Sequence, residues 1–238
     1  MNHNGNSPMP SPEITWIDLE KWPRRTHFES FTTYSRCMIH ASAKIDVTAL
    51  HGACKATGRR FYPAMIVLAA GAANAIPEFR MVLSPERKPG TWNFVSPVYT
   101  TWHDDDKTFS SICTEYDPSP ARLYDAVVRD MERYKDAKGH IVTPVPPNIL
   151  PISCEPELAF DSFCVQPCGE SVYGESVAPT LIWGRYVPGQ DGRLLLPVSV
   201  SIHHAAADGW HIARFFRELQ ARCDAPDALS RPEGASLS

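Results

Sequence analysis

The alternation of apolar and polar residues is clearest near the C-terminal end of the chain. Val198, Val200 and Ile202 alternate with serines, and this period of two is typical of a half-buried strand. After a short gap, apolar residues recur at the helical spacing i, i+3, i+4, i+7, namely Ile212, Phe215, Phe216 and Leu219. The pattern predicts a strand over residues 195–202, a turn, and a helix over residues 210–219.

The same two periods divide the rest of the chain into further elements. Strands are predicted over residues 34–45, 92–102 and 178–186, and around Ser153. Helices are predicted over residues 46–55, 64–74 and 119–138. The helix over residues 64–74 is apolar on nearly all sides, which predicts that it is buried, and Pro77 follows its end.

Composition predicts one domain with two loose ends. The chain has 238 residues, 43% of them hydrophobic, which is enough for one large core. Residues 1–13 and 224–238 are rich in small polar residues, proline or glycine and are expected to be disordered tails. Because no linker or repeat separates the remaining residues, 14–223 are expected to form a single domain.

Charge and cysteine content exclude several classes of protein. A net charge of −4 argues against a nucleic-acid partner, which requires a basic face, and no apolar run is long enough to span a membrane. The seven cysteines are scattered and odd in number, so we expect reduced thiols in the cytoplasm. The acidic triplet Asp104–Asp106 is expected to be a solvated turn, because three consecutive residues cannot all face one ion, and no metal site is predicted.

The candidate chemistry lies between the C-terminal strand and helix. His203 and His204 stand where the strand ends, and Asp208 and Gly209 open the helix. Taken singly, a histidine is more often structural, Asp208 is explained by helix capping, and Gly209 by a turn. Taken together, H-H-x-x-x-D-G at a strand–turn–helix junction is far more specific, because the strand presents an acid–base group rigidly.

These residues carry a resemblance to a known family. His203–Gly209 resembles the HHxxxDG signature of the coenzyme A-dependent acyltransferases, which include chloramphenicol acetyltransferases and dihydrolipoyl acyltransferase cores. Three further segments, Trp22–Glu29, Phe61–Ile66 and Pro77–Met81, resemble the chloramphenicol acetyltransferase branch, type A. The resemblance covers residues 16–223 and implies an α/β (α+β) two-layer sandwich, a mixed sheet with helices packed on it.

The resemblance also implies a reaction. The family transfers acetyl from acetyl-CoA to the primary hydroxyl of chloramphenicol in a ternary complex, which gives antibiotic resistance and needs no permanently bound cofactor. By motif position His204 is the general base, and Ser153 donates a hydrogen bond to the oxyanion. Arg24 and Asp208 are expected to form a buried ion pair that holds the loop carrying His204. His203 is expected to be structural.

The family further suggests the binding residues and the assembly. Substrate-binding residues by matching position are Phe31, Thr100, Phe109 and Ile182, although Phe109 fits core packing equally well. Tyr186 is expected to contact the acetyl-CoA co-substrate. The family places its active sites between subunits of a homotrimer, so we expect the same here.

Departures from the family pattern concentrate in the expected acceptor pocket. Ile182 stands where the family commonly has threonine, Glu157 replaces a usual tryptophan, and Cys164–Pro167 lies in a segment that usually contains asparagine. The reaction type is therefore better defined than the acceptor. Three alternatives stay open: another alcohol as acceptor, a dihydrolipoyl acyltransferase with a thiol acceptor, and a binding protein of the same fold without catalysis.

Overall fold

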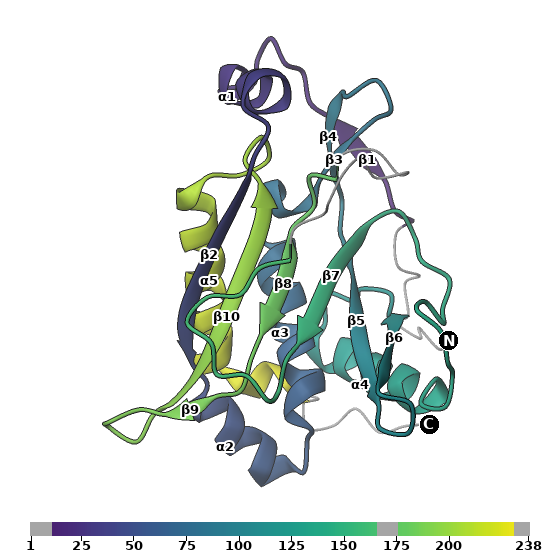
Figure 1. The fold of residues 1–238 in the computed structure, drawn as a ribbon, viewed down its shortest axis with the longest axis vertical. Helices are drawn as coiled ribbons and strands as arrows, with labels where there is room; N and C mark the ends of the chain where they lie inside the picture. The colour runs from purple at the N-terminus through teal and green to yellow at the C-terminus, as the bar shows by residue number, and fades with distance from the viewer. Residues whose placement is uncertain (1–10, 166–175, 231–238) are drawn as a thin grey trace, which may run out of the picture.

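A mixed β-sheet forms the frame of the molecule. The computed structural model describes residues 11–165 and 176–230 (Figure 1). Along the main sheet the strands follow the order β2 (Met38–Asp46), β10 (Leu194–His203), β8 (Thr180–Trp183), β7 (Ile149–Cys154), β5 (Ser96–His103) and β6 (Thr108–Cys113), and β9 (Val187–Pro188) pairs with β10. Strand β7 runs parallel to β5 and β8, and the other pairs are antiparallel. The predicted mixed sheet is confirmed.

Helices cover one face of this sheet. The longer helices are α2 (Thr48–Thr57), α3 (Phe61–Asn74), α4 (Pro120–Arg133) and α5 (Gly209–Asp224). In Figure 1, α3, α4 and α5 lie behind the sheet. Val198, Val200 and Ile202 of β10 are fully buried with α3 in the main core, as the alternating pattern predicts. The second layer consists of these helices, which confirms the two-layer sandwich.

The opposite face of the sheet, called the polar face below, carries serine and threonine side chains as well as apolar ones. Alternate residues of the inner strands point away from the helices, because successive side chains of a strand point to opposite faces. The register aligns three of them in one row across the sheet: Ser153 of β7 pairs with Ile182 of β8, which pairs with Ser199 of β10. The segment after β7 covers part of this face, since Ser199 Oγ donates a hydrogen bond to the Phe163 carbonyl at 2.5 Å.

A smaller sheet and two short helices lie at one end of the main sheet. The small sheet has the order β1 (Ile14–Trp16), β4 (Pro89–Trp92) and β3 (Met81–Leu83), and β3 follows directly after the 3₁₀-helix η2 (Pro77–Arg80). Helix α1 (Arg25–Glu29) continues into a π-helical turn, η1 (Ser30–Tyr34). The predicted strand over residues 34–45 therefore starts later, at Met38.

The expected disordered ends are shorter than predicted. Helix α5 extends to Asp224, a 3₁₀-helix, η3, follows over Pro226–Leu229, and Leu229 is buried in the core. The prediction of a loose tail from residue 224 is therefore wrong as far as residue 230. At the other end, Asn93 holds residues 11–13 through Glu13 N–H and the Ser11 carbonyl. The rest of both predicted tails, residues 1–10 and 231–238, lies outside the described residues.

Within the described part of the chain, none of the helices has both the length and the apolar character needed to cross a membrane.

Candidate active site

His204 has a defined ring orientation. Strand β10 ends at His203, and the backbone N–H of His204 donates to the Cys37 carbonyl at 3.0 Å, which ties the turn to the start of β2. Its ring Nδ1 lies 3.1 Å from the Ala207 carbonyl oxygen. A carbonyl oxygen only accepts, so this contact places the proton of a neutral ring on Nδ1. The lone pair is then on Nε2, the atom that can act as a base.

The aromatic ring of Phe31 fixes the plane of this imidazole. The two rings are stacked with centroids 3.7 Å apart and an interplanar angle of 12°. Phe31 belongs to the π-helical turn η1, so the wider winding of this turn helps to set the position of the Phe31 ring against His204. The sequence predicted Phe31 as a substrate-binding residue, and the structure places it directly against the candidate base.

Arg24 and Asp208 meet as the sequence predicted. Arg24 Nη1 lies 2.5 Å from Asp208 Oδ2 although the two residues are 184 positions apart. Arg24 Nη2 also donates to the His204 carbonyl at 3.4 Å and does not contact the imidazole ring. The pair is less buried than expected, because the Asp208 side chain keeps 36% of its surface exposed.

Asp208 is at once an ion-pair partner and a helix cap. While Oδ2 faces Arg24, Oδ1 accepts a hydrogen bond from the Trp210 N–H at 3.0 Å at the start of α5. Partial burial acts to raise the pKa of Asp208, but hydrogen bonding to Arg24 and the charge of His211 outweigh it, so the pKa lies below its ordinary value. The capping interpretation and the ion-pair interpretation are therefore both correct.

Two residues that the sequence reasoning missed complete this group. His211 Nδ1 lies 2.8 Å from Asp208 Oδ1, and His211 Nε2 lies 3.5 Å from a carboxylate oxygen of Glu78. The signal was present in the spacing, because a residue that can bond the N-cap backbone three positions after a capping Asp forms a capping box. We refer to Arg24, Glu78, His204, Asp208 and His211 as the base cluster.

A second group of predicted residues lies elsewhere on the sheet. Ser153 is the fifth residue of β7 and pairs with the buried Ile182. Thr100 of β5 follows directly after the Tyr99–Ile152 pair, so it is level with Ser153. Its carbonyl accepts a hydrogen bond from the Tyr62 hydroxyl at 2.8 Å. We refer to Thr100, Ser153 and Ile182 as the serine row.

The serine row and the base cluster are far apart in one chain. The row meets β10 at Ser199, four residues before His203, which is about 13 Å along the strand. Strand β7 is two strands from β10, which adds about 10 Å across the sheet, so the Cα atoms of Ser153 and His203 are separated by roughly 16 Å. His204 follows one residue further from the row. In Figure 1 the arrows of β10 and β7 point in opposite directions, so the C-terminal ends of these two strands lie at opposite ends of the sheet.

The exposed aromatic residues of β5 and β6 lie on the side of the serine row. Trp102 pairs with Phe109 in the sheet, and their side chains are 57% and 46% exposed. Core packing of Phe109, the alternative left open by the sequence, is therefore wrong. The sequence did not predict a role for Trp102, because its position beside Phe109 depends on the pairing of β5 with β6 and not on its neighbours in the chain.

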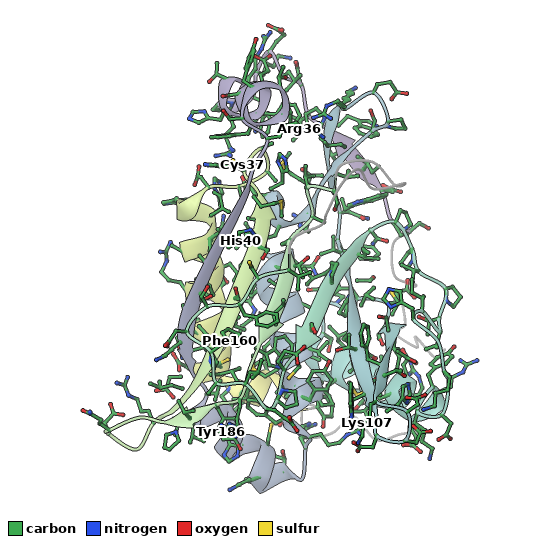
Figure 2. All side chains as sticks on the ribbon, in the orientation of Figure 1. Arg36, Cys37, His40, Lys107, Phe160 and Tyr186 are labelled. Atoms are coloured by element: carbon green, nitrogen blue, oxygen red, sulfur yellow. The ribbon has the colours of Figure 1, made fainter. Side chains whose placement is uncertain are left out.

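Tyr186 belongs to an aromatic cluster at the end of the sheet away from His204. Its hydroxyl lies 3.2 Å from His51 Nε2, and its ring packs edge-on against Phe61 with centroids 5.6 Å apart. Figure 2 shows Tyr186 at the lower end of the sheet and Cys37, whose carbonyl binds the His204 N–H, at the upper end. Arg60 and Arg185, the neighbours of Phe61 and Tyr186 in sequence, are exposed.

The acidic triplet forms a turn held by lysine. Lys138 Nζ lies 2.5 Å from Asp105 and 3.1 Å from Asp106, and the segment connects β5 to β6. Among the residues that the structure describes, no three His, Cys, Asp or Glu side chains gather in a way that suits a metal ion.

Comparison with known proteins places the chain in a family. The family model "Chloramphenicol acetyltransferase" matches residues 13–220. The chain is 36% identical to chloramphenicol acetyltransferase of Clostridium perfringens over 205 residues, 86% of this chain and 92% of that protein. It is 38% identical to chloramphenicol acetyltransferase 2 of Escherichia coli over 214 residues, 89% of this chain and 97% of that protein.

Solved structures share the fold. A chloramphenicol acetyltransferase superposes with a TM-score of 0.72 at 21% identity, covering 89% of this chain and 98% of that one. A dihydrolipoamide acetyltransferase of Azotobacter vinelandii superposes with a TM-score of 0.62 at 18% identity, covering 86% and 88%. The family model and the curated relatives, which cover nearly the full length, decide between these two branches. The chain belongs to the chloramphenicol acetyltransferase family.

Proposed function

We propose that this protein is a chloramphenicol O-acetyltransferase, an acyltransferase that uses acetyl-CoA as co-substrate and thereby confers resistance to the antibiotic. The observation that carries the proposal is the state of His204. Its Nδ1 is engaged by the Ala207 carbonyl, its ring plane is fixed by Phe31, and Nε2 is left as the acceptor. A hydroxyl is a poor nucleophile at neutral pH, so a base held in this way is what the reaction requires.

The proposed acetyl transfer begins with His204 Nε2 acting as the base. His204 Nε2 removes the proton of the acceptor hydroxyl while its oxygen attacks the thioester carbonyl carbon of acetyl-CoA. A tetrahedral oxyanion forms, the C–S bond breaks, and the departing thiolate of CoA takes the proton back from the imidazolium. The acetyl group moves directly between substrates in the ternary complex, so the protein itself is not acylated.

Ser153 is proposed to stabilise the oxyanion. Its side chain lies on the face of the sheet away from the helices, level with Thr100 on one neighbouring strand and with Ile182 on the other. One preorganised donor aimed at a developing oxyanion contributes roughly 3–4 kcal/mol to transition-state stabilisation. Thr100 and Phe109 are proposed to line the acceptor pocket beside it, together with Trp102.

The separation of the two groups supports an active site shared between subunits. A donor to the oxyanion must lie within about 3 Å of the reacting atoms, and Ser153 lies roughly 16 Å from His203, the residue before His204, in the same chain. We therefore propose a homotrimer with three sites, each combining His204 of one subunit with the serine row of the next. The exposed Trp102 and Phe109 fit this arrangement, because a neighbouring subunit and the acceptor would cover them.

The aromatic cluster around Tyr186 suits the nucleotide end of acetyl-CoA. Tyr186 and Phe61 offer ring surface to an adenine, and the exposed guanidinium groups of Arg60 and Arg185 offer charge to phosphates. The pantetheine arm would then run along the sheet toward the serine row.

The location of the protein in the cytoplasm remains a prediction from the sequence.

The acceptor is the least constrained part of the proposal. Ile182 presents a buried apolar side chain beside Ser153, and Glu157 is exposed on the segment that follows β7. Residues 166 and 167 of the altered segment lie outside the described residues. The test below therefore includes another alcohol, and a thiol such as a dihydrolipoyl group, as the acetyl acceptor.

The test is the release of CoA thiol from acetyl-CoA with chloramphenicol as acceptor, with His204→Ala measured beside the wild type. We expect rapid release by the wild type and a loss of several orders of magnitude in the variant, with acetyl-CoA binding retained. Activity only with another alcohol or with dihydrolipoamide would reassign the acceptor and keep the base. Equal thiol release by both proteins would overturn the assignment of His204.

A further inference from the structure

His211 occupies an unusual position between two carboxylates. It is the third residue of α5, and its side chain is almost completely buried. Nδ1 faces Asp208 Oδ1 at 2.8 Å, and Nε2 faces Glu78 Oε1 at 3.5 Å. The two carboxylates come from different parts of the fold, one from the N-cap of α5 and the other from the 3₁₀-helix η2 before the small sheet.

The carboxylates of Asp208 and Glu78 determine which nitrogens of the His211 ring donate hydrogen bonds. Nδ1 also lies 3.2 Å from the backbone nitrogen of Asp208, whose N–H it would accept in the capping box. Nδ1 can either accept that N–H or donate to Oδ1, but it cannot do both at once. An ionised carboxylate accepts only, so donation from Nδ1 to Asp208 Oδ1 gives the shorter contact and the charge-assisted one. A ring protonated on both nitrogens donates to Asp208 and to Glu78 at the same time.

We infer that His211 is a positioning residue for the catalytic base, acting through Asp208. Its hydrogen bond fixes Oδ1 of Asp208, which leaves Oδ2 directed at Arg24, and Arg24 in turn holds the His204 carbonyl. Glu78 anchors the far side of the imidazole and so fixes His211 itself. The inference rests on the proposed function, because it assigns His211 to the presentation of His204.

Without His211, Asp208 loses one of the two side chains that orient it. The carboxylate would then be held only by Arg24 and by the Trp210 N–H, and with this looser hold the Arg24 contact to the His204 turn would loosen as well. A displacement of the base by about 1 Å is enough to lower the rate about 100-fold. Substrate binding does not depend on that orientation, so the loss should appear in kcat and not in KM for acetyl-CoA.

Two amide substitutions separate the two contacts of the ring. In His211→Asn the amide nitrogen reaches the position of Nδ1, so donation to Asp208 is retained and the Glu78 contact is lost. In His211→Gln the longer side chain reaches the position of Nε2 and gives up the Asp208 contact. We expect kcat within about 3-fold of wild type for Asn and about 10- to 100-fold lower for Gln, with unchanged KM for acetyl-CoA.

Two controls distinguish positioning from stability. His103→Asn removes another buried histidine, whose Nε2 bonds Ser110 Oγ at 2.8 Å, and it should lower stability without changing kcat of the folded enzyme. In an Asp208→Asn background, His211→Gln should add little to the loss of kcat, because it acts through Asp208. Equal kcat for the Asn and Gln variants, or full additivity with Asp208→Asn, would overturn the inference.

One readout is independent of the acceptor. The ¹⁵N chemical shifts of the His204 imidazole, assigned by their loss in His204→Ala, report which nitrogen carries the proton. We expect the Nδ1–H form in the wild type and in His211→Asn, and a mixture in His211→Gln. A wild type that is silent toward chloramphenicol with these shifts intact contradicts the proposed function alone. Identical shifts in all three proteins contradict the role of His211.

Discussion

At the scale of single residues, one hydrogen bond decides what His204 can do. The backbone carbonyl of Ala207 occupies Nδ1, so the neutral ring offers its lone pair at Nε2. The three alanines between His204 and Asp208 are completely buried, so the turn that supplies this carbonyl is packed from within. Small apolar residues at those positions make the turn rigid without adding a competing polar group.

The charge of Asp208 predicts a change in stability at acid pH. Because the folded protein lowers the pKa of Asp208, its ionised form stabilises the fold at pH values above the unfolded pKa of about 3.9. That contribution is lost as the pH falls through the lower folded value. Asp208→Asn cannot ionise, so we expect it to be less stable than wild type at pH 7 and to approach wild type below about pH 4.

Urea unfolding midpoints of both proteins between pH 7 and pH 3 check this prediction. A difference between the midpoints that stays constant over the whole range would show that the loss in Asp208→Asn comes from the helix cap alone, since capping by a neutral amide does not depend on pH in this range.

The sequence identified the residues of the base cluster only in part. His204, Asp208 and Arg24 were predicted from motif positions, and the structure brings Arg24 and Asp208 together. His211 and Glu78 were missed because each has an ordinary explanation in its own segment. The spacing of His211 from Asp208 is a local capping signal, but its contact with Glu78 joins α5 to η2, and no local pattern encodes that contact.

At the scale of elements, the two periodicities predicted most strands and helices, and local chemistry decided their ends. Only the first residue of the predicted strand over residues 92–102 belongs to β4, and β5 begins at Ser96, because the Asn93 side chain accepts hydrogen bonds from the N–H groups of Glu13 and Phe94 and ends β4. Helix α2 begins at Thr48 and not at Asp46, because the Asp46 carboxylate accepts the Thr48 N–H at 2.9 Å. Such contacts involve one or two residues and do not alter the hydrophobic pattern.

The segment that covers the polar face of the sheet depends on one glycine. A Cβ at Gly184 would lie 2.2 Å from the Leu158 carbonyl and 2.9 Å from the Phe160 ring. The next residue, Arg185, donates its N–H to that same carbonyl at 2.7 Å. The close approach of the two backbones therefore positions residues 155–165 over the sheet.

We predict that Gly184→Ala displaces this segment. Overpacking of this kind costs about 1–3 kcal/mol of unfolding free energy. Because the segment carries Glu157 and flanks the proposed acceptor pocket, KM for the acceptor should rise more than KM for acetyl-CoA. The matched control is Gly52→Ala on α2, where no atom lies within 4 Å of the added Cβ. It should be neutral or stabilising by up to about 1 kcal/mol. Equal stability of the two variants in urea unfolding would contradict the prediction.

At the scale of the whole molecule, the register of the sheet separates the base from the serine row. The sequence assigned His204 and Ser153 to the same reaction without indicating how far apart they lie in one chain, because a motif carries no information about distance. The separation follows from the pairing of β7, β8 and β10, which joins segments far apart in the chain. Pairing over such separations is set by the packed core and not by any local pattern.

A shared site predicts recovery of activity in mixed assemblies. His204→Ala and Ser153→Ala should each be severely impaired alone. If they are unfolded and refolded together in equal amounts, about a quarter of the interfaces of random cyclic trimers combine an intact His204 with an intact Ser153. We expect about a quarter of wild-type activity in the mixture, measured as CoA thiol release, and a trimer mass by sedimentation. Activity no higher than the mean of the two separate variants would place the whole site within one subunit.

The pairing of β2 with β10 has a consequence for the synthesis of the protein. His40 meets Ser201 across 161 residues, and Arg24 meets Asp208 across 184. Among the described residues, β10 is the only strand that pairs with β2. During synthesis, β2 and Arg24 therefore leave the ribosome well before their partners in β10 and at Asp208 have been made. A prematurely terminated chain lacks the turn that carries His204 and leaves an early strand edge open to aggregation. Only chains that have been synthesised past His204 could therefore transfer acetyl groups, and chains arrested before residue 204 would have no acetyltransferase activity.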